Sequence, residues 1–190
     1  MKKGFTLIEL LVVIAILAIL ATVIVVIINP GELLKQARDT TRISDLAAVN
    51  SAIAFYLSDV TTPKLYAAAD CTAGIKFATF GIATATPFIS AGTYPAAAAT
   101  TSVGGTGWVS VNFTSISSGS PLARLPMDPS NTAANYYAYA CGTGNALNYE
   151  LDAKMESTKY ATTAGSEVVS NAKDGGDNAT WYEIGNSLVQ

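Results

Sequence analysis

The strongest constraint on this chain is an apolar segment near its N-terminus that contains a single acidic side chain. From Phe5 to Ile28 every residue is apolar except Glu9 and two threonines. As a helix, these roughly 24 residues would extend about 36 Å, more than the roughly 30 Å thickness of the hydrocarbon core of a bilayer. The segment therefore predicts a membrane-spanning helix.

The carboxylate of Glu9 needs an explanation of its own. A charged side chain at bilayer depth costs at least about 2.5 kcal/mol unless it has a partner or a function. The next basic residue along the chain is Lys35, about 39 Å away in a continuous helix. No cation of the same helix can therefore neutralise Glu9. If the chain were cut after Gly4, the new α-ammonium group of Phe5 would supply the missing positive charge, within the chain or on a packed neighbour.

The first residues resemble a known processing signal. The segment Lys2 to Glu9, KKGFTLIE, resembles the class III signal of type IV pilins and of type II secretion pseudopilins. This resemblance implies that a prepilin peptidase cleaves after Gly4, that the new N-terminal Phe5 is methylated, and that Glu9 pairs with that amine of a neighbouring subunit during filament assembly. It also implies a precursor in the inner or cytoplasmic membrane, with its C-terminal domain outside, and an extracellular or cell-surface filament after assembly.

Two other interpretations of the apolar segment stay open at this point. A secretory signal has a shorter apolar core, of about 7–15 residues, followed by a cleavage site with small residues. An uncleaved single-pass anchor of a binding module explains the length, but neither Gly4 nor Glu9. Basic residues lie on both sides of the segment, so the distribution of charge does not decide its orientation. A major pseudopilin of a type II secretion system would share every N-terminal feature of a pilin.

Composition narrows the classes of function. The chain has 190 residues, no histidine and a formal net charge of −3. An acidic surface argues against sequence-independent binding of nucleic acid. The lack of histidine excludes Ser-His-Asp and Cys-His sites and argues against a catalytic zinc site. The sequence shows no isolated carboxylate pair in an apolar setting, so we expect no enzyme. The resemblance to pilins implies that the partners are copies of the same chain, the membrane, the prepilin peptidase and the pilus assembly machinery.

The remaining sequence predicts an α+β fold in which a long N-terminal helix, membrane-spanning and then amphipathic, packs on a small antiparallel sheet. The expected segments are a leader at 1–4, an assembly helix at 5–30, an amphipathic helix at 31–60, a variable Ala/Thr/Gly-rich loop region at 61–107, and the sheet with a C-terminal loop at 108–190. Pro30 and Gly31 predict a kink between the two parts of the helix, because proline cannot continue the hydrogen-bond ladder.

The amphipathic helix is expected to end near Asp59 and to have two faces. Its apolar stripe comprises Leu33, Ala37, Leu46, Val49, Ile53 and Tyr56, and the charged residues Lys35, Arg38, Asp39, Arg42 and Asp45 predict a solvated face. The phenylalanines Phe77, Phe80 and Phe88 are possible anchors of the loop region. The predicted strands are Val109 to Phe113, Tyr136 to Cys141, Leu147 to Glu156 and Trp181 to Ile184, with a hairpin loop at 142–145. The third strand alternates strictly, which predicts one face toward the helix and one toward water.

Two further sets of residues are candidates for covalent or metal chemistry. Cys71 and Cys141 are 70 positions apart, which excludes a C-x-x-C pair. In an exported domain they form one disulfide, worth about 4 kcal/mol in the chain-entropy model, or remain two buried thiols. The acidic, glycine-rich turn of residues 173–178 suits calcium, with Asp174 and Asp177 as ligands and Asp128 as a more remote option. Major pseudopilins carry calcium in a C-terminal loop, but such a segment is also a common simple turn.

Overall fold

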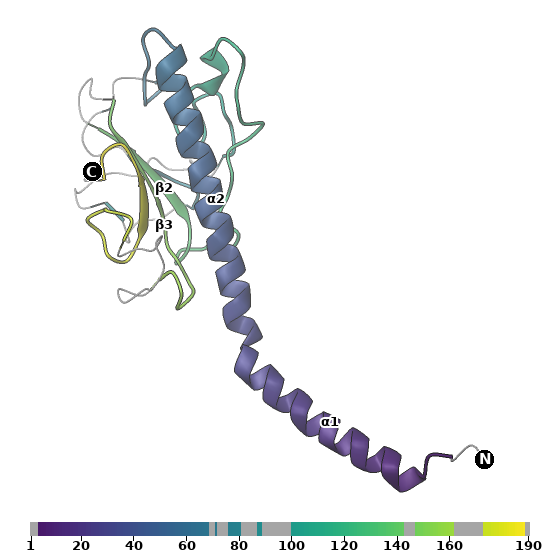
Figure 1. Cartoon of the computed structure of the whole chain (residues 1–190). Coiled ribbons are helices and arrows are strands. Elements are labelled where there is room, and N and C mark those ends of the chain that lie inside the picture. The colour runs from purple at the N-terminus through teal and green to yellow at the C-terminus, as the bar shows by residue number, and fades with distance from the viewer. Residues whose placement is uncertain are drawn as a thin grey trace.

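A computed structural model describes residues 4–68, 71, 76–80, 87–88, 100–142, 147–161 and 173–188. A long helical rod carries a small domain at one end (Figure 1). Its elements are helices α1 (Leu7–Ile28) and α2 (Pro30–Asp59), the short 3₁₀ helix η1 (Phe113–Ser115), and strands β1 (Lys76–Ala78), β2 (Tyr137–Cys141), β3 (Tyr149–Ala153) and β4 (Tyr182–Gly185). The predicted α+β class, with an apolar N-terminal helix and a small antiparallel sheet, is confirmed.

The rod bends where α1 and α2 meet (Figure 1). Asn29 lies between the two helices with φ 45° and ψ 76°, in the left-handed region that asparagine tolerates better than most residues. Pro30 disfavours a helical conformation at the residue before it, and it lacks the N–H that would continue α1. The Asn29 carbonyl oxygen accepts a hydrogen bond from the Glu32 N–H at 2.9 Å. The structure thus places the break at Asn29, with Pro30 as the first residue of α2 and Gly31 inside its first turn.

The second half of α2 packs on one face of the sheet. The core-facing residues of α2 are Leu46, Val49, Ala52, Ile53 and Tyr56, and they share one apolar cluster with Phe77, Tyr139 and Leu151 of the sheet. The helix ends at Asp59, as the sequence predicts. Leu33 and Ala37, in contrast, are exposed. The predicted stripe is therefore wrong at its N-terminal end, where the domain contacts α2 through the polar side chains of Glu32, Asp39 and Arg42.

The sheet has the order β1-β2-β3-β4 and every neighbouring pair is antiparallel. One cross-strand row, Phe77, Tyr139, Leu151 and Ile184, belongs to the core beneath α2. The two adjacent rows are Lys76, Ala140, Glu150 and Gly185, and Ala78, Ala138, Asp152 and Glu183. Because side chains alternate along a strand, these two rows lie on the opposite face of the sheet.

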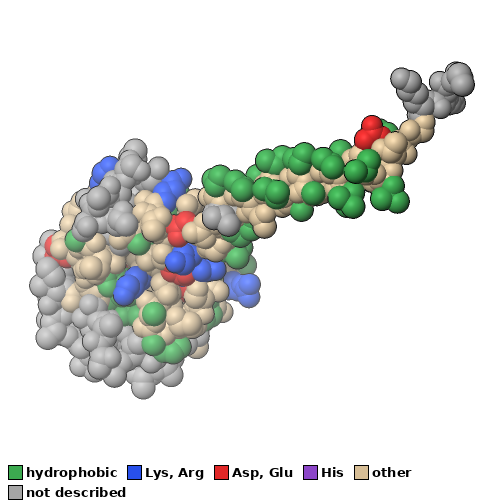
Figure 2. Space-filling model, turned by 90° about the horizontal axis from the view of Figure 1, so that it is seen from below, with side chains coloured by type: hydrophobic (Ala, Val, Ile, Leu, Met, Phe, Trp, Pro, Cys, Tyr) green, Lys and Arg blue, Asp and Glu red, His purple; other side chains and the backbone are tan. Residues whose placement is uncertain are grey.

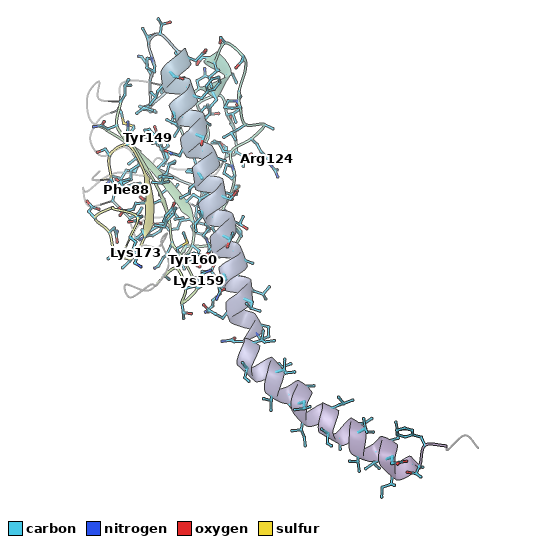
Figure 3. The ribbon with its side chains drawn as sticks, viewed as in Figure 1. Phe88, Arg124, Tyr149, Lys159, Tyr160 and Lys173 are labelled. Carbon is cyan, nitrogen blue, oxygen red and sulfur yellow. A yellow bond between two sulfur atoms is a disulfide. The ribbon has the colours of Figure 1, made fainter. Side chains whose placement is uncertain are left out.

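That opposite face is not open to water. A second apolar cluster covers it and comprises Ala78, Phe88, Tyr136, Ala138, Ala140 and Trp181. Figure 3 shows Phe88 and Lys173 on the side of the sheet away from α2. Glu150 and Asp152 are both completely buried, so the predicted solvent-facing side of β3 is wrong. The side chains of β3 alternate between the two faces of the sheet as predicted, but a second layer of side chains covers the face that was expected to be in water.

The loop regions contain further differences from the predictions. The predicted strand from Val109 to Phe113 is wrong: this segment is buried but irregular, with one isolated bridge between Gly104 and Asn112, and it leads into η1. Strand β1 lies within the region that we expected to be loop. Of the proposed anchors, Phe77 and Phe88 are buried and Phe80 is partly buried. Residues 143–145 of the predicted hairpin loop lie outside the described residues, but the two strands that flank it are paired as expected.

The solvated charged face predicted for α2 is wrong at Asp39 and Arg42, whereas Lys35 is exposed as predicted. Arg42 and Asp39 are completely buried. The Arg42 guanidinium donates to Asp128 (Nε to Oδ2, 2.6 Å), to Asp39 (Nη1 to Oδ1, 2.8 Å) and to Glu156. Hydrogen bonds from Arg38 and then from Arg42 lower the pKa of Glu156 to about 2. We call these five residues the ionic cluster; it joins α2 to the segments that precede β2 and follow β3.

The two cysteines form a disulfide, as predicted, with a Cα–Cα distance of 6.0 Å. Replacing both Cys71 and Cys141 by alanine is expected to lower the free energy of unfolding by up to about 4 kcal/mol, because the unfolded chain loses its cross-link. Urea unfolding of the full chain in detergent measures this loss. A reductant should destabilise the wild type by a similar amount and leave the double variant unchanged. Equal stability of wild type and variant would contradict the prediction.

Candidate functional site

Helix α1 is exposed along its whole length. Its large apolar side chains, apart from that of residue 26, range from 45% exposed at Val13 to 82% exposed at Leu7. The stretch Leu7–Val25 has a mean hydropathy of 3.1, none of it is buried, and it is long and apolar enough to cross a membrane. Figure 2 shows hydrophobic side chains along this rod beyond the domain. In the described part of the chain nothing covers this surface, which therefore needs lipid or other apolar helices around it.

The start of α1 is fixed by a capping box. Thr6 donates to the Glu9 Oε2 atom through its backbone N–H at 2.8 Å and through its hydroxyl at 2.7 Å, and the Glu9 N–H donates to the Thr6 Oγ1 atom at 3.3 Å. The helix therefore begins at Leu7, not at Phe5. The T-x-x-E spacing of Thr6 and Glu9 is a sequence signal for such a cap and for a helix start at residue 7.

The capping box leaves Gly4 and Phe5 before the helix. Both residues are exposed, Phe5 to 79%. An exposed peptide bond outside regular structure is the kind of bond that a peptidase hydrolyses most readily. The geometry of the Gly4–Phe5 bond is thus compatible with the cleavage that the N-terminal residues imply.

The capping box gives Glu9 hydrogen bonds but no positive charge. The N-terminal end of a helix stabilises a carboxylate by about 0.3–1 kcal/mol. Among the described residues, no Lys or Arg forms an ion pair with Glu9, and Lys35 pairs instead with Glu32 at 4.0 Å. Both capping hydrogen bonds to Glu9 use Oε2, and in the described part of the chain none reaches Oε1. Glu9 is therefore held in place, with one oxygen left for a donor from elsewhere.

The three residues predicted as calcium ligands have different surroundings in the structure. Asp128 belongs to the ionic cluster on α2. Asp174 closes its own turn: its Oδ1 accepts from the Gly176 N–H at 3.0 Å and its Oδ2 from the Glu183 N–H at 2.9 Å. Asp177 is exposed. A calcium ion bound by Asp174 and Asp177 stays a prediction.

The structure also gathers acidic residues that the sequence analysis did not single out. Glu150 and Asp152 from β3 and Glu183 from β4 form a buried carboxylate cluster beneath the turn of residues 173–178. The sequence appeared to have no carboxylates in an apolar setting because we expected this face of β3 to be in water. The E-x-D spacing was the available signal that these two side chains share a face.

Comparison with known families identifies the N-terminal segment. Residues 1–25 match the family model described as the prokaryotic N-terminal methylation motif. The match contains Gly4, Phe5 and Glu9 and covers most of α1. Searches of curated proteins and of solved structures found no match to this chain. The chain therefore carries the class III signal peptide of type IV pilin-like proteins, and with its apolar helix it fits a membrane-anchored precursor of the pilin or pseudopilin kind.

Proposed function

We propose that this protein is a prepilin that is cleaved after Gly4 and whose mature form polymerises through α1 into a type IV pilus or related extracellular filament. The observation that carries the proposal is the contrast between the two helices. α2 buries its apolar face in the domain, whereas α1 exposes apolar side chains on every side. We further propose that the role of the protein is structural and not enzymatic.

The exposed apolar surface of α1 suits both the membrane-bound precursor and the subunit in the filament. In the membrane, lipid surrounds the apolar side chains of α1. When the assembly machinery extracts the subunit, the same surface must be buried again to avoid contact with water. The helices of other copies are apolar partners of matching length. Repeated addition of identical subunits by a head-to-tail contact gives an open helical filament, with the domains around the outside, where they determine what the filament adheres to.

Glu9 sets the register of this addition. Cleavage creates an α-ammonium group at Phe5, and the capping box holds the Glu9 carboxylate at the same end of α1 with Oε1 free of capping hydrogen bonds. A subunit placed with its amine beside Glu9 of a neighbour neutralises two charges among apolar helices. A subunit shifted by one turn leaves both charges unpaired, which is costly at low dielectric. The ion pair between the Phe5 amine and Glu9 therefore determines the alignment of neighbouring subunits more than it contributes to the stability of the filament.

The first test is the intact mass and the N-terminal sequence of the protein purified from its own cells. We expect an N-terminus at Phe5 with one added methyl group. A Gly4→Leu variant is the control and should keep Met1, because the larger side chain is expected to block the peptidase. Native protein that begins at Met1 would contradict the proposal and support an uncleaved, membrane-anchored binding module.

A major pseudopilin of a type II secretion system would give the same N-terminus. Deletion of the gene separates the two proposals. Loss of a surface filament with normal protein export supports the pilus, whereas loss of export without loss of a surface filament supports the pseudopilin.

A further inference from the structure

The side of the sheet away from α2 buries three acidic side chains together. Glu150 and Asp152 on β3 are 0% exposed, and Glu183 on β4 is 2% exposed. One carboxylate oxygen of each residue lies within 4.8 Å of those of the other two. The register explains this, since Asp152 pairs with Glu183 across the strands and Glu150 lies two residues earlier on the same face. Three carboxylates thus converge on one point inside the domain.

Among the described residues, most of these oxygens have no hydrogen-bond donor. Both carboxylate oxygens of Glu150, both of Asp152 and Oε1 of Glu183 are buried and accept no hydrogen bond from the described residues. Ionised groups in this condition are costly, so they must share protons or bind a cation. The cluster is therefore short of positive charge.

Lys76 cannot supply all of the missing charge. It lies in the same cross-strand row as Glu150, and its Nζ atom is 4.8 Å from the centre of the Phe88 ring. Glu150 and Asp152 both attract the Lys76 ammonium group. One ammonium group neutralises at most one carboxylate. The two that remain match the charge of a divalent cation.

The glycine-rich turn closes over this cluster. The Asn178 N–H donates to Oε2 of Glu183 at 3.1 Å, so this oxygen is held by the turn while Oε1 remains in the cluster. A Cβ atom at Gly176 would lie 1.7 Å from Oε2 of Glu183, so only glycine allows this approach. A surface pocket of about 300 Å³ is lined in part by Asp174 and Glu183. An ion therefore has a route from solvent to the edge of the cluster.

We propose that Glu150, Asp152 and Glu183 bind a hard divalent cation, and that calcium is this cation. The ligands are anionic oxygens without nitrogen or sulfur, which is the set that calcium prefers and zinc does not. The turn of residues 173–178 covers the ion, and its Asp174 and Asp177 are not the main ligands. The proposal concerns the folded domain and does not depend on filament assembly.

Calcium binding is tested on the full chain in detergent after removal of bound metal with a chelator. Calorimetric titration with CaCl₂ should show one ion per chain with a Kd below about 1 mM, as in extracellular calcium modules. Thermal unfolding should shift to higher temperature in calcium. The Asp152→Asn variant keeps the shape of the side chain and removes one buried charge. We expect it to lose at least tenfold in affinity while its metal-free form unfolds no earlier than the metal-free wild type.

The matched control is Asp177→Asn, which removes the exposed carboxylate of the turn. Its affinity should remain within about twofold of the wild type, since an exposed surface charge is screened by solvent and salt. Loss of binding in Asp177→Asn with normal binding in Asp152→Asn would overturn the proposal and place the ion on the turn. A wild type that does not respond to calcium at about 10 mM would also overturn it, because even weak extracellular sites are filled at that level. A response to MgCl₂ but not to CaCl₂ would overturn the choice of cation.

Discussion

Replacing Arg42 by alanine is expected to lower the free energy of unfolding of the domain by about 3–5 kcal/mol. The variant leaves Asp39 and Asp128, which are almost completely buried, without their guanidinium partner. Among the described residues it leaves Glu156 with Arg38 as its one cationic partner. Urea unfolding of the full chain in detergent measures the loss. Trp108 and Trp181 are both buried, so their fluorescence reports on unfolding.

The control for this prediction is Arg38→Ala. Arg38 pairs with Glu156 at 2.6 Å, but its side chain is 34% exposed, so its removal should cost about 1 kcal/mol or less. Equal losses in the two variants would contradict a special role for the buried arginine. The pKa of Glu156 adds a second check. Since this pKa is lowered to about 2, the stability that Glu156 contributes is complete above its unfolded value of about 4.3 and is lost as the pH falls through 2. The difference in the free energy of unfolding between wild type and Arg42→Ala should therefore become smaller in acid.

The second large effect is expected at Glu9. The Glu9→Gln variant should be processed and inserted into the membrane normally but should fail to assemble. Glutamine serves in a capping box as well as glutamate does, so this change removes the charge and keeps the helix start. The amount of filament sheared from the cell surface should decrease at least about tenfold, because each added subunit would lack its charge pair. Immunoblotting of sheared and membrane fractions measures this ratio.

The matched control is Thr6→Val. This variant removes the hydroxyl that donates to Glu9 and accepts from its N–H, but it keeps the charge and the backbone hydrogen bond of residue 6. It should assemble nearly as well as the wild type. If Thr6→Val prevented assembly and Glu9→Gln did not, Glu9 would act only as a helix cap and the proposed charge pair would be wrong.

The features that the sequence predicts well are those that depend on neighbouring residues. The length of the apolar segment, the break next to Pro30 and the end of α2 at Asp59 all follow from local chemistry. The cysteine pairing was one of two stated outcomes, and the structure decides it. The start of α1 differs by two residues because Thr6 caps the helix. Here the signal was present in the sequence and was not used.

The features that were mispredicted depend on residues far apart in the chain. Arg42 pairs with Asp128, which is 86 positions away, and with Glu156, which is 114 positions away. No periodicity in α2 reveals these partners. Likewise, alternation along β3 separates its two faces but does not say what covers each one. Phe88 and Trp181 cover the face that holds Glu150 and Asp152, and both come from outside the paired strands. Local sequence patterns therefore could not predict which charged residues are buried.

The direction of α1 relative to α2 depends on the backbone of Asn29, the single residue between the two helices. α1 has 22 residues and is therefore about 33 Å long. A rotation of about 10° about one backbone bond of Asn29 displaces the far end of such a helix by up to about 6 Å. In a filament whose centre is built from α1 helices, the same small rotation changes the tilt of the outer domain without disturbing the packing at the axis. In the proposed filament, Asn29 would thus separate the geometry of the interior from the geometry of the outer surface.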